Sequence, residues 1–254
     1  MIGFMFFDTH CHLSTFKDIP STIAKAKAHS VKYILAVSMY YQDNWTVLKL
    51  AKEYTEVIPA LGIHPIEAAN LTNMEEKLEI INALLLENKI RIIGEIGLDR
   101  YFIKEKQLWE KQERLLKYFL NLAANNKFVV NLHGKDAEKE LFDLLLKYNL
   151  DSVVVHWFSG TPKLIKEGIN RGYFFSVTPA VFYSEKMRKV VELVPLEQLL
   201  SESDGPCKFR GQMPFIGEPA LMENVIREIA SIKHQNPEEI ENILYYTAKK
   251  IFLE

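Results

Sequence analysis

Histidines and acidic residues recur at the ends of short apolar segments, where they could bind metal ions. The first example is FFDTHCH at positions 6–12, with two histidines one residue apart. The full set is His10, His12, His64, Glu95, His133, His156 and Asp204. Imidazole nitrogens and carboxylate oxygens form a ligand set suited to zinc, manganese or magnesium. The pattern therefore predicts a metal site assembled from distant segments.

The apolar segments that carry these residues are typical of buried β-strands. They are rich in Val, Ile, Phe and Tyr and alternate with segments of helical periodicity. We expect strands near residues 4–10, 33–39, 57–63, 90–97, 128–133, 152–158, 173–179 and 199–205. Eight strands alternating with helices predict an α/β fold, a (β/α)8 TIM barrel. A doubly wound open sheet is the rival architecture, but no glycine-rich phosphate loop follows the first strand.

The helices between the strands carry their own start signals. Thr161 and Pro162 predict the beginning of a helix that ends near Gly172. After the eighth strand, Asn236 as N-cap and Pro237 at the first helical position predict a closing outer helix. We find no linker or internal repeat and expect one domain over residues 1–254.

Alternation along each strand decides which polar side chains meet. Alternate residues share a face, so His133 should point the same way as Asn131, and Asp204 the same way as Glu202. In the first strand the same rule groups Phe4, Phe6, Asp8, His10 and His12, with Cys11 on the opposite face. In a barrel these ends converge at the C-terminal rim, where barrel enzymes hold their sites.

Composition limits the partners and the cellular compartment. The chain has 31 Lys and Arg against 33 Asp and Glu, so it lacks the basic excess of a protein that binds nucleic acid by charge alone. Two cysteines, Cys11 and Cys207, do not make a disulfide framework and favour a reducing compartment. The apolar start MIGFMFF is too short for a signal peptide or a membrane span. We expect a cytoplasmic protein that does not enter membranes.

Seven short motifs support a more specific interpretation. They are DTHCH at 8–12, GIHP at 62–65, GEIGLD at 94–99, HGKDA at 133–137, HWFSG at 156–160, ESDGP at 202–206 and EPALM at 218–222. In this order and spacing the chain resembles the TatD family of metal-dependent deoxyribonucleases, over essentially its whole length. The family usually has an arginine where this chain has Lys135 and a cysteine where it has Trp157.

The resemblance implies a site with two divalent metal ions, Mg, Mn or Zn. His10, His12 and Asp204 would hold one ion, His133 and His156 the other, and Glu95 would bridge both. Glu95 and Asp204 would also be catalytic, with Asp204 orienting the attacking water or accepting its proton. Such a pair of ions suits hydrolysis of a phosphodiester bond.

Other residues near the rim are candidates for substrate binding. His64 matches a family position that we expect to contact substrate or to support the ligands. Lys135 supplies a cation for a phosphate. Tyr101, Phe102, Trp157 and Phe158 could stack on bases, although aromatic residues near strand ends commonly serve only in packing.

Three functions remain open at this stage. The first is a nuclease acting on DNA, on single strands or ends, without an obligate protein partner. The second is a metallohydrolase of small esters, amides or aminoacyl-tRNA, which an apolar pocket beside the metals would favour. The third is a metal-binding or scaffold barrel without catalysis, which the intact ligand set argues against.

Overall fold

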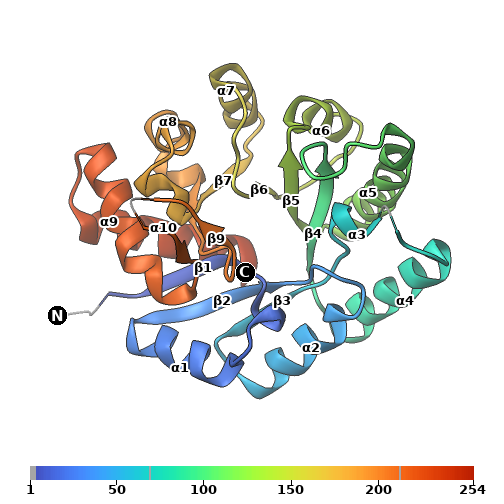
Figure 1. Cartoon of the computed structure of the whole chain (residues 1–254), viewed down its shortest axis with the longest axis horizontal. Helices are drawn as coiled ribbons and strands as arrows, with labels where there is room; N and C mark the ends of the chain where they lie inside the picture. Colours follow the sequence, from blue (N-terminus) through green and yellow to red (C-terminus); the bar gives the residue numbers. More distant parts are fainter. Residues whose placement is uncertain (1–3, 69, 212) are drawn as a thin grey trace.

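The computed structural model describes residues 4–68, 70–211 and 213–254. Residues 1–3 of the apolar N-terminal segment and residue 212 of the loop after the eighth strand lie outside the described residues. The strands form a ring with helices around its outside (Figure 1). Within the described residues the ring consists of β1 Phe6–Cys11, β2 Val31–Val37, β3 Val57–Ala60, β4 Ile92–Asp99, β5 Val129–Lys135, β6 Val153–Val155, β7 Phe174–Val177 and β8 Leu199–Ser201.

Parallel pairing runs around the ring in two sections, β1–β3 and β4–β8. The sections meet between β3 and β4, where the Leu61 N–H donates to the Ile92 carbonyl at 3.2 Å. They meet again between β8 and β1, where the Asp204 N–H donates to the His10 carbonyl at 3.0 Å and the His12 N–H to the Gly205 carbonyl at 2.8 Å. The predicted (β/α)8 barrel is confirmed, and two segments with predicted ligands close it.

Helices follow the strands as the periodicity indicated. They are α1 Ile19–Ala28, α2 Asp43–Glu53, α3 Pro65–Ala68, α4 Met74–Glu87, α5 Lys106–Asn126, α6 Glu138–Leu145, α7 Pro162–Asn170, α8 Glu185–Leu193, α9 Met222–Lys233 and α10 Pro237–Phe252. Both predicted caps are confirmed, since the Thr161 side chain accepts from the Leu164 N–H and the Asn236 side chain from the Glu238 N–H. A short hairpin, β9 Lys208–Phe209 and β10 Phe215–Ile216, lies between β8 and α9.

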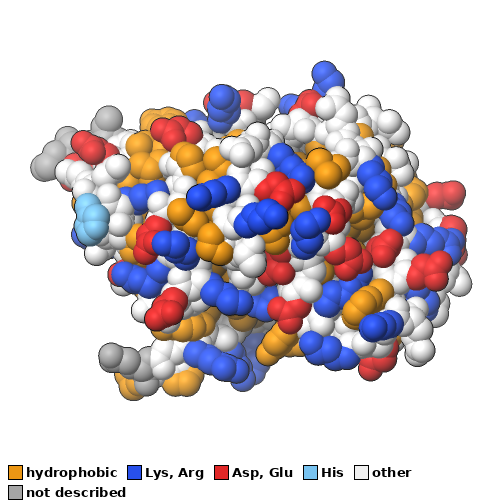
Figure 2. All heavy atoms as spheres, turned by 90° about the horizontal axis from the view of Figure 1, so that it is seen from above, with side chains coloured by type: hydrophobic (Ala, Val, Ile, Leu, Met, Phe, Trp, Pro, Cys, Tyr) orange, Lys and Arg blue, Asp and Glu red, His pale blue; other side chains and the backbone are white. Residues whose placement is uncertain are grey.

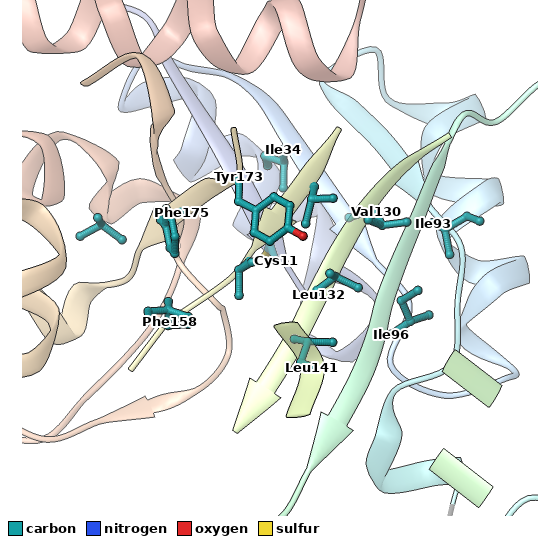
Figure 3. Packing of buried hydrophobic residues seen from close by; sticks show 14 of the residues in the cluster. Cys11, Ile34, Ile93, Ile96, Val130, Leu132, Leu141, Phe158, Tyr173 and Phe175 are labelled. Atoms are coloured by element: carbon teal, nitrogen blue, oxygen red, sulfur yellow. The ribbon is translucent and has the colours of Figure 1, made fainter. Parts of the chain in front are cut away.

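Apolar side chains pack in two layers. The larger cluster lies between strands and helices and includes Ile93, Ile96, Val130 and Leu132 (Figure 3). The smaller cluster joins residues near the strand starts with one side of α10; its buried members include Phe7, Ile92, Val129, Val154, Leu200, Ala248 and Phe252. Helix α10 therefore closes the N-terminal end of the barrel, and the opposite end is left for the site.

The alternation predicted for the first strand proves wrong, and β4 also has an irregular register. In β1, Phe6 packs in the larger cluster together with Cys11, whereas Phe7 belongs to the smaller one. The pairing of β1 with β2 shifts between Phe6 and Phe7 and again between Asp8 and Cys11, so the simple two-residue period is broken. In β4 the register shifts between Ile93 and Ile96. Such bulges re-aim side chains, and here they direct His10 and Glu95 inward.

On the face shown in Figure 2, basic and acidic side chains are interspersed. In the described part of the chain, no helix is long and apolar enough to cross a membrane.

Candidate metal centre

Glu95 lies at the centre of the polar residues gathered at the C-terminal end of the barrel. It is 1% exposed, and its two carboxylate oxygens face different histidines. The Oε2 atom is 3.3 Å from His10 Nε2 and 3.2 Å from His12 Nε2. Asp204 Oδ1 lies 3.6 Å from both of these nitrogens. Three potential ligands, His10, His12 and Asp204, thus form a first group with Glu95 Oε2.

The other oxygen of Glu95 faces a second group. Its Oε1 atom is 2.7 Å from His156 Nε2, 2.8 Å from His133 Nδ1 and 3.4 Å from His64 Nε2. The ring of His156 also stacks on that of His10, with centroids 3.9 Å apart. The structure therefore brings all seven predicted polar residues into one cluster, with Glu95 between two groups of histidines.

The cluster has the chemical character of a cation site. His10 Nε2 and Glu95 Oε2 are buried atoms with no hydrogen-bond partner among the described residues. A buried polar atom without a partner costs free energy, and a bound cation would satisfy both of these atoms at once. Two sets of potential ligand atoms, His10 with His12 and Glu95, and His64 with His133 and Glu95, each lie within 4.8 Å of one another.

Electrostatics within the cluster favour positive charge. Burial lowers the pKa values of His12, His133 and His156, but the facing carboxylates outweigh burial and raise all three. Burial raises the pKa of Glu95, but the imidazoles of His156, His64 and His10 outweigh it and hold that pKa well below its ordinary value. A site that stabilises added protons in this way also stabilises metal cations.

The tautomer of His10 is fixed by the hydrogen-bond partner of its Nδ1 atom. Nδ1 lies 2.9 Å from Asn131 Oδ1, and the Asn131 amide group in turn donates to the Thr9 carbonyl at 3.3 Å. Since the facing Asn131 atom is an acceptor, His10 Nδ1 carries the proton. The Nε2 lone pair is then free for a metal ion.

Two carboxylates orient the histidines of the second group in the same way. Asp99 Oδ2 accepts from His133 Nε2 at 2.8 Å, and Glu202 Oε1 lies 3.4 Å from His156 Nδ1. Burial raises the pKa of Asp99 and of Glu202, but the facing histidines outweigh it and lower both. Both acids are thus ionised acceptors that hold the protons on His133 Nε2 and His156 Nδ1, so in the neutral rings His133 Nδ1 and His156 Nε2 are the nitrogens left for a metal ion.

His64 has the opposite arrangement. Its Nδ1 atom accepts a hydrogen bond from the Ile66 backbone N–H at 3.1 Å, so a neutral His64 carries its proton on Nε2. Burial lowers the pKa of His64 to about 4, which keeps the ring neutral at pH 7. The Nε2–H group points into the cluster as a hydrogen-bond donor, 3.3 Å from His133 Nδ1.

A buried pair of side chains positions the segment that carries Asp204. Asp8 Oδ1 accepts from the Ser203 N–H at 2.8 Å and Oδ2 from the Ser203 hydroxyl at 2.6 Å. Asp204 itself has a φ of 44°, a left-handed conformation that needs such support. Burial raises the pKa of Asp8 to about 7. Asp8 and Ser203 thus tie the end of β8 to β1 beside His10.

Several supporting residues received no role in the sequence analysis. Asn131 and Glu202 precede His133 and Asp204 by two positions, so alternation placed them on the correct faces without revealing their partners. Asp99 lies in the GEIGLD motif and could have been recognised there. Among the candidate stacking residues, Phe158 is buried in the core at 1% exposure and does not reach the rim surface.

Comparison with known proteins identifies the family. Residues 7–253 match the family model described as TatD related DNase. The chain is 30% identical over 258 residues to the uncharacterized metal-dependent hydrolase YabD of Bacillus subtilis, with 98% of this chain and 99% of that protein covered. It is 29% identical over 259 residues to the deoxyribonuclease TATDN3 of Homo sapiens, with 96% and 93% covered.

Solved structures agree with this assignment. The TatD homologue YJJV from Escherichia coli superposes with a TM-score of 0.89 at 27% identity, over 97% of each chain. A TatD family hydrolase from Entamoeba histolytica, at 20% identity, supports the fold with a TM-score of 0.86 over 100% of this chain and 99% of that one. The chain therefore belongs to the TatD-related DNase family of metal-dependent hydrolases.

Proposed function

We propose that this protein is a deoxyribonuclease that hydrolyses phosphodiester bonds of DNA with two divalent metal ions. One observation carries the proposal: the two oxygens of Glu95 face two separate groups of histidine nitrogens. A carboxylate that serves one ion with each oxygen offsets the repulsion between two cations. The human relative that is named a deoxyribonuclease supports DNA as the substrate.

The proposed ligands divide between the two groups. His10, His12 and Asp204 would hold one ion with Glu95 Oε2, and His133 and His156 would hold the other with Glu95 Oε1. Mg, Mn or Zn bound there would acidify a water molecule and stabilise negative charge on the phosphoryl oxygens.

The remaining steps belong to side chains of this protein. Burial raises the pKa of Asp204 despite the opposing charges of His10 and His12, so Asp204 is suited to orient the attacking water and accept its proton. The Nε2–H group of His64 would donate to a phosphoryl oxygen. Lys135, two residues beyond His133 on β5, would bind a neighbouring phosphate.

The shape of the barrel favours single strands or strand ends as substrates. Helix α10 packs across one end of the barrel, so DNA would reach the cluster from the other end. We also propose a cytoplasmic location, which the two free cysteines, Cys11 and Cys207, support.

The test is cleavage of a 3'-labelled single-stranded oligodeoxynucleotide. Protein stripped of metal is resupplied with Mg, Mn or Zn, and Glu95→Ala protein is compared with Glu110→Ala protein, which loses an exposed carboxylate on α5. We expect metal-dependent shortening that Glu95→Ala abolishes and Glu110→Ala leaves intact. Absence of cleavage by folded, metal-loaded protein would contradict the proposal and favour a small ester, an amide or aminoacyl-tRNA as substrate.

A further inference from the structure

A cation and two aromatic rings lie together just beyond the proposed ligands. The Lys135 ammonium is 5.0 Å from the centre of the Trp157 ring and 5.7 Å from the centre of the Tyr101 ring. Lys135 follows His133 by two residues on β5, and Trp157 follows His156 directly. These three side chains, which we call the rim cluster, therefore come from the same chain segments as the second group of ligands.

The backbone contacts of Trp157 couple it to that group. Its N–H donates to Glu202 Oε1 at 3.1 Å, the same oxygen that faces His156 Nδ1. Its φ is 38°, and its ring packs on the buried Phe209 ring with centroids 5.2 Å apart. A large aromatic side chain held by these contacts is a preorganised surface beside the metal centre, and loses little entropy when a ligand binds.

The charge of Lys135 is available to a ligand. Within the part of the chain that the structure describes, no carboxylate forms an ion pair with Lys135. Burial and the Asp204 carboxylate raise the pKa of the Cys207 thiol to about 12 while the Lys135 ammonium opposes them, so the ammonium acts close to the Asp204 segment. Tyr101 is 46% exposed, which leaves much of its ring open to solvent.

We propose that the rim cluster binds the nucleotide next to the scissile phosphate, with Lys135 on the phosphodiester and the rings of Trp157 and Tyr101 against the base. A base offers its face to an aromatic ring only when it is unpaired and unstacked, so this subsite selects single strands and frayed ends over intact duplex. The Lys135 side chain is flexible, so its ammonium group can leave the face of the Trp157 ring and contact a phosphate oxygen while the base stacks on that ring. This inference rests on the proposed function and names the form of DNA that the same site accepts.

The first test measures binding without turnover, through tryptophan fluorescence. The chain has three tryptophans, and Trp45 lies on α2 and is 40% exposed. The ligand is a phosphorothioate-linked pentathymidylate that resists cleavage, and its matched control has abasic sugars in place of the nucleotides. We expect this ligand to quench the fluorescence of native and Trp45→Phe protein but not of Trp157→Phe protein, and the abasic ligand to bind about tenfold more weakly.

The second test measures cleavage of a normal oligonucleotide and of one with an abasic end. For the normal substrate we expect KM to rise about tenfold in Trp157→Ala and Tyr101→Ala, and by a smaller factor for the abasic substrate. Lys135→Met should raise KM for both substrates, whereas Lys106→Met, which removes an exposed lysine at the start of α5, should change neither.

The outcomes separate the two proposals. If no metal supports cleavage but the pentathymidylate quenches Trp157, the deoxyribonuclease proposal fails and the nucleotide subsite stands. If the native protein cleaves DNA while Trp157→Phe responds as the native protein does and abasic ligands bind equally well, the subsite is overturned and the nuclease stands. Absence of both cleavage and binding overturns the subsite as well.

Discussion

At the scale of single residues, hydrogen bonds behind the ligands decide what each histidine can do. One ring nitrogen in each of three histidines faces a side-chain oxygen: that of Asn131 for His10, Asp99 for His133 and Glu202 for His156. The other ring nitrogen of each histidine faces Glu95. His64 receives a backbone N–H instead and becomes a donor. The five histidines thus divide into four proposed metal ligands and one hydrogen-bond donor, His64, because their hydrogen-bond partners differ.

Replacing Asp99 by asparagine tests this role. The amide cannot provide the charged acceptor for His133 Nε2, and its NH2 group can favour the wrong tautomer. We expect metal affinity at the second group to fall roughly 10- to 100-fold while the first group is affected less. Chelator competition measures the affinity, and Asp151→Asn, an exposed aspartate outside the site, is the control. Unchanged affinity in Asp99→Asn would contradict the assignment of Asp99 as an orienting acceptor.

His64→Ala tests the donor assignment. Because His64 presents a proton and no lone pair, its loss should leave metal content unchanged. The loss of a donor to the phosphoryl group should reduce kcat/KM roughly 100-fold. Metal analysis and oligonucleotide kinetics on the same preparation check both parts. A loss of bound metal in His64→Ala would show that His64 is a ligand.

At the scale of elements, α10 is the part of the molecule that closes the barrel. Its N-terminus is set by Asn236 and Pro237, and the side chains of Ala248 and Phe252 enter the smaller apolar cluster. The Phe252 ring packs against the ring of Phe7 on β1, with ring centroids 5.7 Å apart. Because β1 also carries His10, the C-terminal helix and the metal centre are attached to the same strand.

Removal of the Phe252 ring measures this contribution. Phe252→Ala should lower the free energy of unfolding by about 3 kcal/mol, since it removes buried apolar surface and leaves a cavity. The neighbouring Leu253 is 38% exposed, so Leu253→Ala should change the free energy of unfolding by less than about 0.5 kcal/mol. Urea denaturation followed by circular dichroism provides both values. Equal effects of the two substitutions would show that α10 does not seal the barrel through Phe252.

For the molecule as a whole, folding brings histidines and carboxylates from distant segments into one cluster that a metal cation would complete. The barrel brings five histidines and two carboxylates from six strand ends into one cluster, where His10 Nε2, His12 Nδ1 and Glu95 Oε2 have no hydrogen-bond partner among the described residues. These separated segments form no such site in the unfolded chain. Metal binding should therefore be coupled to the stability of the fold.

Metal removal tests this coupling. A ligand at 100 times its Kd stabilises the native state by about 2.7 kcal/mol, so chelation should lower Tm by several degrees and resupplied metal should restore it. Glu95→Ala protein should show little response to metal, because Glu95 lies between both groups. Differential scanning calorimetry with and without metal checks the shift. A Tm that does not depend on metal in the native protein would contradict the ligand assignment.

Sequence reasoning predicted the barrel, its helix caps and the residues that meet at its rim. Alternation was sufficient for β5, β6 and β8, where Val129, Val154 and Leu200 point inward as Asn131, His156 and Glu202 do. It was insufficient for β1, where Phe6 and Cys11 pack in the same layer. A bulge depends on how neighbouring strands pair, and a single strand does not encode that pairing locally.

Which residue types stand at the strand ends follows from the sequence, because the apolar segments and their periodicity predict buried strands whose ends meet at one rim. Three features come from the folded structure: the partner of each histidine nitrogen, the division of the Glu95 oxygens between two groups, and the backbone hydrogen bonds that close the ring between β8 and β1. These features depend on contacts between segments up to 195 positions apart, such as Asp8 with Ser203. Hydrogen bonds of this kind form only after the chain has folded, since their strength depends on distance, direction and exclusion of water.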